Sequence, residues 1–114
     1  MGLVLATVGC THVQLAPDTM GNFKLGELQV YADRAFLDAH DAVIRGLKDL
    51  NAMQTQDDRK AIEAEVQARD AGGQMVIVKI KEIGPRRTSI KIRYGIPGDL
   101  AQEQRVYAAI QKHL

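Results

Sequence analysis

One stretch decides the fold: Met75-Val-Ile-Val-Lys-Ile-Lys-Glu-Ile-Gly-Pro-Arg-Arg-Thr-Ser-Ile-Lys-Ile-Arg-Tyr94. Apolar and polar residues alternate in both of its halves, with the period of a strand that buries one face. Gly84-Pro-Arg-Arg87 interrupts the alternation and predicts a turn. The stretch therefore predicts two antiparallel strands, with one face apolar and the other solvated.

The alternation continues before this stretch. Residues 62–69 place four apolar side chains on one face, and Asp70-Ala-Gly-Gly73 predicts the next turn; the inward residues are Ile62, Ala64, Val66 and Ala68. Residues 51–57 alternate weakly and predict an edge strand, followed by a turn at Asp57-Asp-Arg59. Residues 26–32 predict a short first strand.

Two segments have helical rather than strand periodicity. Residues 34–50 carry one apolar stripe, with Asp33 as the expected N-cap; the stripe is Phe36, Ala39, Val43, Leu47 and Leu50. A final helix follows Asp99, which has the spacing of a capping box with Gln102. We predict an α+β fold of order β-α-β-β-β-β-α, with both helices on one face of an antiparallel sheet.

The expected core combines sheet and helix residues. We expect the sheet to contribute Val66, Val78, Ile80, Ile90 and Ile92, and the helices to contribute Phe36, Val43, Leu47, Val106 and Ile110.

Composition excludes several classes of protein. The chain has 114 residues, 46% hydrophobic and 25% charged, with a net charge of +1 that does not favour nucleic acid. Its single cysteine excludes an intramolecular disulfide and a multi-cysteine zinc site. No stretch approaches the roughly 18 apolar residues of a membrane-spanning helix.

The N-terminal segment, Met1-Gly-Leu-Val-Leu-Ala-Thr-Val-Gly-Cys10, indicates lipidation. An apolar run and a small residue before a cysteine resemble the end of a lipoprotein signal, although Thr7 stands where leucine is usual. We interpret residues 1–9 as a truncated lipoprotein signal, residues 10–25 as an irregular tether containing Pro17 and Gly21, and residues 26–114 as the α+β domain. The alternative is a small buried cysteine on a first strand.

The same order of features resembles a family. Its pattern stands here as Ala39, Ala42 and Leu47, then Thr88-Ser-Ile-Lys-Ile-Arg-Tyr-Gly95, then Gly98-Asp99. Residues 26–114 resemble a domain-of-unknown-function family of small bacterial envelope lipoproteins. The resemblance implies an anchor of palmitate-type acyl chains at Cys10 and a place on the periplasmic face of the outer membrane. It implies no activity and supplies no catalytic residues.

Charge segregates on the solvated face of the predicted sheet. Glu63 and Glu65 lie on one strand, and the following two strands and their turn are basic, with Lys79, Lys81, Arg86, Arg87, Lys91 and Arg93. One interpretation is cross-strand ion pairing that keeps the sheet soluble. The other is an interaction patch for anionic headgroups, peptidoglycan or an acidic protein.

Other titratable residues form no recognisable site. His40 and Asp41 are adjacent on a helix and cannot face each other, so we expect a solvated His40. His12, His40 and His113 lack metal-ligand spacing, Asp57-Asp58 lacks the further acids of a calcium loop, and Asp99 would repel an anion from the last helix. We expect no metal or cofactor.

These observations favour a non-enzymatic interaction module held on a membrane. Two alternatives remain open: a small-molecule-binding domain with a pocket between sheet and helices, and an enzyme whose site has no recognisable motif.

Overall fold

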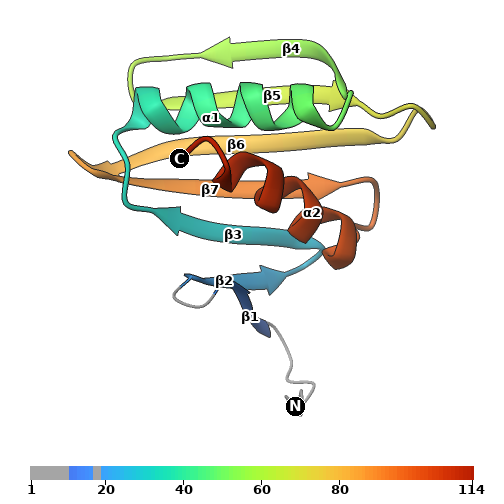
Figure 1. Cartoon of the computed structure of the whole chain (residues 1–114), viewed down its shortest axis with the longest axis horizontal. Helices are drawn as coiled ribbons and strands as arrows, with labels where there is room; N and C mark the ends of the chain where they lie inside the picture. The colour runs from blue at the N-terminus through green and yellow to red at the C-terminus, as the bar shows by residue number, and fades with distance from the viewer. Residues whose placement is uncertain (1–10, 17–18) are drawn as a thin grey trace.

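The computed structural model describes residues 11–16 and 19–114. Cys10 and the predicted signal of residues 1–9 lie outside these residues. One antiparallel sheet of seven strands has the order β1-β2-β3-β7-β6-β5-β4 (Figure 1). The strands are β1 (Thr11–Ala16), β2 (Thr19–Lys24), β3 (Glu27–Ala32), β4 (Met53–Arg59), β5 (Glu63–Arg69), β6 (Met75–Gly84) and β7 (Arg87–Tyr94). The helices are α1 (Phe36–Asp49) and α2 (Leu100–Gln111). From β3 onward the order is β-α-β-β-β-β-α, which confirms the predicted α+β fold.

Both helices cover the same face of the sheet and pack against each other (Figure 1). Gly46 permits this contact, because a Cβ added there would lie 2.7 Å from the backbone nitrogen of Ile110. All ten residues predicted for the core are buried beneath or within the helices. On the opposite face of the sheet, which we call the open face, residues 11–16 and 19–114 place no helix. No helix in the described part of the chain is long and apolar enough to cross a membrane.

The three central strands follow the predicted alternation. Val66 faces Val78, and Val78 in turn faces Ile92, so the buried side chains form rows across the sheet. Ile62 is an exception to the predicted alternation, because it lies before β5 and is exposed. The expected turns at 70–73 and 84–87 both connect paired strands.

The predicted irregular backbone after Cys10 is wrong where the structure describes it. β1 pairs with β2, and β2 pairs with β3, extending the sheet past the expected first strand. The β2–β3 turn has Leu25 at φ 54° and Gly26 at φ 79°, the signs of a type I′ hairpin turn. Leu-Gly is a weak hairpin signal. The hydrogen bonds between β2 and the edge of β3 therefore stabilise a strand that the local sequence does not predict.

Two local expectations were also wrong. Ala35, not Asp33, is the N-cap of α1, and no side chain bonds to this helix end. The predicted edge strand is confirmed as β4, but it continues through Asp57 and Asp58, and the chain turns at residues 60–62. β4 is exposed throughout, so its backbone pairing with β5, rather than apolar alternation, defines its length.

Candidate functional site

The open face carries the predicted basic residues. Lys79 of β6 lies directly opposite Lys91 of β7, and Arg93 lies opposite Ile77. Their chain neighbours Val78, Ile80, Ile90 and Ile92 are buried on the helix side, so the cations point away from the helices. We call Lys79, Lys81, Lys91 and Arg93 the basic strip.

Acidic residues lie beside the basic strip on the same face. Glu65 is opposite Lys79, Glu63 is opposite Lys81, and Asp58 of β4 is opposite Glu65. We call Glu63 and Glu65 the acidic strip, and residues of both strips line a shallow hollow of about 420 Å³. Within residues 11–16 and 19–114, none of these cross-strand neighbours forms an ion pair. Glu65 instead accepts a 2.6 Å hydrogen bond from Gln67, so the predicted ion pairing is not what organises this face.

The two arginines of the β6–β7 turn extend this surface. Arg86 and Arg87 are exposed at the turn, and Arg87 faces Gly84 across it. The Arg87 guanidinium lies 4.9 Å from the ring centre of Tyr31 on β3, a cation–π arrangement. The structure therefore brings the six predicted patch residues onto two adjacent strands and their turn.

Two histidines, His40 and His113, form separate pairs with carboxylates. His40 lies 2.9 Å from Asp57 of β4, and its side chain is only 13% exposed, so the expected solvated His40 is wrong. β4 lies against α1 and supplies Asp57 as the partner of His40. The two residues are 17 positions apart, so the sequence analysis did not pair them. Asp41 pairs with Arg45 instead of His40, and His113 lies 2.6 Å from Asp49. Among the described residues, no three potential metal ligands come together.

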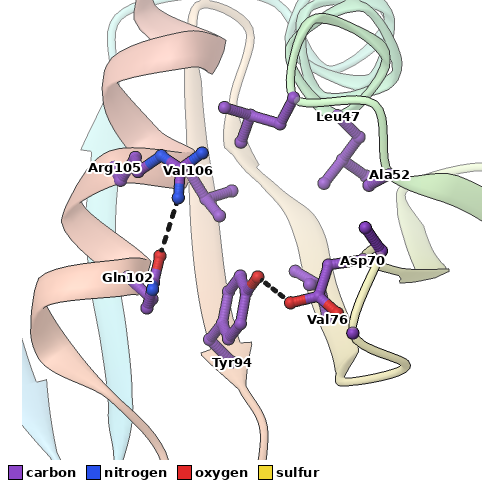
Figure 2. A pocket seen from close by; sticks show the side chains of 11 residues that line it. Leu47, Ala52, Asp70, Val76, Tyr94, Gln102, Arg105 and Val106 are labelled. Atoms are coloured by element: carbon purple, nitrogen blue, oxygen red, sulfur yellow. Dashed lines mark hydrogen bonds between the residues drawn. The ribbon is translucent and has the colours of Figure 1, made fainter.

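A cleft opens between the ends of the two helices and the β5–β6 turn (Figure 2). It encloses about 220 Å³. Its apolar wall consists of Leu47, Leu50, Ala52, Val76 and Val106. Its polar residues are Asp70, Tyr94, Gln102 and Arg105. We call this the Tyr94 cleft.

Asp70 and Tyr94 form one side of the cleft. The Tyr94 hydroxyl donates to Asp70 Oδ2, while the backbone N–H of Gln74 donates to Oδ1 at 2.9 Å. These hydrogen bonds hold the pKa of Asp70 below its usual range, with the Tyr94 bond the larger cause. Burial, followed by the bond to Asp70, raises the pKa of Tyr94 to about 12. At neutral pH the pair is therefore a carboxylate and a protonated phenol.

Arg105 forms the other side. Its Nη1 donates to Gln102 Oε1 at 3.2 Å. The guanidinium is exposed and close enough to Tyr94 to oppose the rise in the pKa of that hydroxyl. Figure 2 shows Arg105 and Asp70 on opposite sides, with the Tyr94 ring between them.

The fold also buries one acid that the sequence analysis missed. Glu103 of α2 is 0% exposed, and its Oε2 accepts from the backbone N–H groups of Tyr94 at 3.0 Å and Asp99 at 3.2 Å. Desolvation raises its pKa. Asp99 caps the helix as predicted, accepting from the Gln102 N–H, so the two acids together hold the loop between β7 and α2. The available signal was a glutamate on the apolar stripe of this helix, beside Val106 and Tyr107.

These features define an α+β domain that buries one face of a single sheet under two helices and exposes the other as a charged surface. The chain belongs to a family of proteins of unknown function, DUF3568, whose model matches residues 2–113. Among curated proteins, none matches the chain.

Proposed function

We propose that the protein is a non-enzymatic interaction module of the bacterial envelope, lipid-anchored through Cys10, whose basic strip docks on anionic membrane headgroups. The observation that carries this proposal is the direct opposition of Lys79 and Lys91 on the open face. Like charges at such a position destabilise a sheet. An anionic surface placed over them would attract both lysines and so offset this repulsion.

The strand order of the sheet supports docking through the basic strip. Cys10 immediately precedes β1, which forms one edge of the sheet, and acidic β5 and β4 lie at the other. The basic strands β7 and β6 lie between these edges, nearer β1 in the strand order than the acidic strands are (Figure 1). Cations near an anionic membrane contribute about 1 kcal/mol each, which complements an acyl anchor.

The acidic strip limits this attraction. Neighbouring strands are about 4.8 Å apart, within the Debye length of about 8 Å at physiological salt, so Glu63 and Glu65 weaken the field of the lysines. Docking through this face should therefore be of moderate affinity, measurable without the lipid anchor and strengthened by it.

The test uses the unlipidated chain and vesicles containing phosphatidylglycerol, with pure phosphatidylcholine vesicles as the neutral reference. We expect salt-sensitive binding to the anionic vesicles, and its loss when Lys79, Lys81, Lys91 and Arg93 are all changed to Gln. A matched variant removes the same charge from the helices and the edge strand, by changing Arg45, Lys48, Arg59 and Lys112 to Gln. Equal binding by the two variants, or none by the wild type, would overturn the docking role.

The anchor is tested separately by the mass of the protein made in a bacterial host with its own leader. Loss of residues 1–9 and a diacyl or triacyl adduct on Cys10 are the expected result. An unmodified cysteine in the mature chain would remove the anchor from the proposal.

A further inference from the structure

The Tyr94 cleft contains one acidic and one basic side chain, Asp70 and Arg105. The carboxylate of Asp70 and the guanidinium of Arg105 both act on the Tyr94 hydroxyl. In the described part of the chain they do not form an ion pair with one another. Both line the same cavity, on opposite sides of it (Figure 2).

Each charged group retains capacity for a ligand. Arg105 donates one hydrogen bond to Gln102, and a guanidinium has several further N–H donors in a planar fork. Asp70 accepts from Tyr94 and Gln74, and a carboxylate has about four acceptor sites. An anionic group therefore fits at Arg105 and a cationic group at Asp70.

The remaining wall is aliphatic. Leu47 of α1, Val76 of β6 and Val106 of α2 line the cavity and belong to the buried core. Leu50 and Ala52 complete this wall at the end of α1. The cavity of about 220 Å³ corresponds to roughly seven water molecules at about 30 Å³ each. It is below the roughly 300 Å³ at which pockets for drug-sized molecules begin, so its ligand is small.

We propose that the Tyr94 cleft binds a small zwitterion, an α-amino acid with a short aliphatic side chain. Its carboxylate lies at Arg105, its ammonium at Asp70, and its side chain against Leu47, Val76 and Val106. A ligand with one charge leaves the opposite group of the cleft without an oppositely charged partner, and a ligand without an aliphatic part leaves the apolar wall in water. The three features together select the zwitterion.

Binding is tested on the whole chain by ¹H–¹⁵N NMR titration with L-valine. We expect saturable shifts centred on the amides of Gly72, Gly73 and Arg105. Isovalerate lacks the ammonium, isobutylamine lacks the carboxylate, and glycine lacks the side chain. Isovalerate and isobutylamine should each bind at least about tenfold more weakly than valine, because a hydrogen-bonded charge is worth more than a tenfold change in affinity. Glycine should also bind at least about tenfold more weakly, because it buries no aliphatic side chain against the apolar wall.

The variants test the two charged positions separately. Arg105→Gln and Asp70→Asn should each weaken valine binding about tenfold or more. Arg59→Gln removes an exposed cation from the far end of β4 and should leave the affinity for valine unchanged. Arg105 is exposed, so Arg105→Gln should fold and decides the matter even where Asp70→Asn does not fold. The absence of saturable shifts with valine, or isovalerate binding as tightly as valine, would overturn the inference.

Discussion

The two faces of the sheet differ most clearly along β7. Ile90 and Ile92 point toward the helices and are 0% exposed, whereas Lys91 between them points to the open face. Burying an isoleucine side chain stabilises the fold by about 1.5–3 kcal/mol, while most exposed substitutions change stability by less than about 0.5 kcal/mol. The covered face therefore determines the fold, and the open face can carry charged residues at little cost in stability.

The largest effect should come from the covered face. Ile90→Ala removes buried methyl groups from the centre of the core and should lower the free energy of unfolding by about 2–5 kcal/mol. Urea denaturation measures the loss, with Lys91→Ala as the control one residue along the same strand. A loss below about 0.5 kcal/mol for Ile90→Ala would mean that the two faces are assigned in reverse.

The next effect concerns the loop that joins the covered face to α2. Glu103→Ala leaves the Tyr94 and Asp99 N–H groups without an acceptor, and should cost about 2–4 kcal/mol. Glu103→Gln keeps an oxygen acceptor and should cost less. Equal losses in the two variants would show that the oxygen does not hold the loop.

Glu103 also predicts a pH dependence. The pKa of Glu103 in the folded chain is raised above its ordinary value of 4.5. Between pH 4.5 and this raised pKa, Glu103 has lost its proton in the unfolded chain but keeps it in the native chain. The free energy of unfolding therefore falls as pH rises through this interval. Asp70, whose pKa is lowered, acts in the opposite sense and only below its ordinary 3.8. In Glu103→Gln, the free energy of unfolding measured by denaturation should no longer fall with pH across this interval. An unchanged fall would contradict the raised pKa of Glu103.

A smaller effect should follow at the helix contact on the covered face. Gly46→Ala places a Cβ 2.8 Å from the Cα of Ile110, so the helices must separate. We expect a loss of about 1–2 kcal/mol, the overpacking cost less the gain in helix propensity. Gly84→Ala, where an added Cβ meets nothing within 4 Å, is the matched control. A stabilised Gly46→Ala would show that the helices adjust freely.

The smallest effect on stability should come from the open face. Lys79→Gln with Lys91→Gln relieves a repulsion between exposed charges, and should change the free energy of unfolding by less than about 0.5 kcal/mol. Thermal denaturation at low salt would detect a larger change. A loss above 1 kcal/mol would mean that these lysines support the fold instead of a partner.

The covered face was predictable because burial leaves a periodic signal. Strict alternation in residues 64–68 and 75–94 placed Val66, Val78 and Ile90 correctly, and the helical stripe placed Val43 and Leu47. Features that depend on tertiary pairing left weaker signals. The β1–β2 hairpin depends on the edge of β3, and β4 is polar throughout.

The candidate sites divide in the same way. The basic strip follows from alternation, since residues two apart share a face. The Tyr94 cleft could not be predicted, because its charged residues are 35 positions apart and meet only when the β5–β6 turn approaches α2; they are Asp70 and Arg105. Glu103 was missed because polar residues on a helix are usually solvated, and its partners are backbone groups of a loop.

The most direct test of the central claim compares the two strips of the open face in one assay. The affinity of the unlipidated chain for phosphatidylglycerol vesicles is measured for Lys79→Gln/Lys91→Gln and for Glu63→Gln/Glu65→Gln. We expect the first variant to bind about tenfold more weakly than wild type and the second to bind more tightly, with both differences shrinking at high salt. Equal affinities for the two variants, or a weakening in both, would contradict docking through the basic strip.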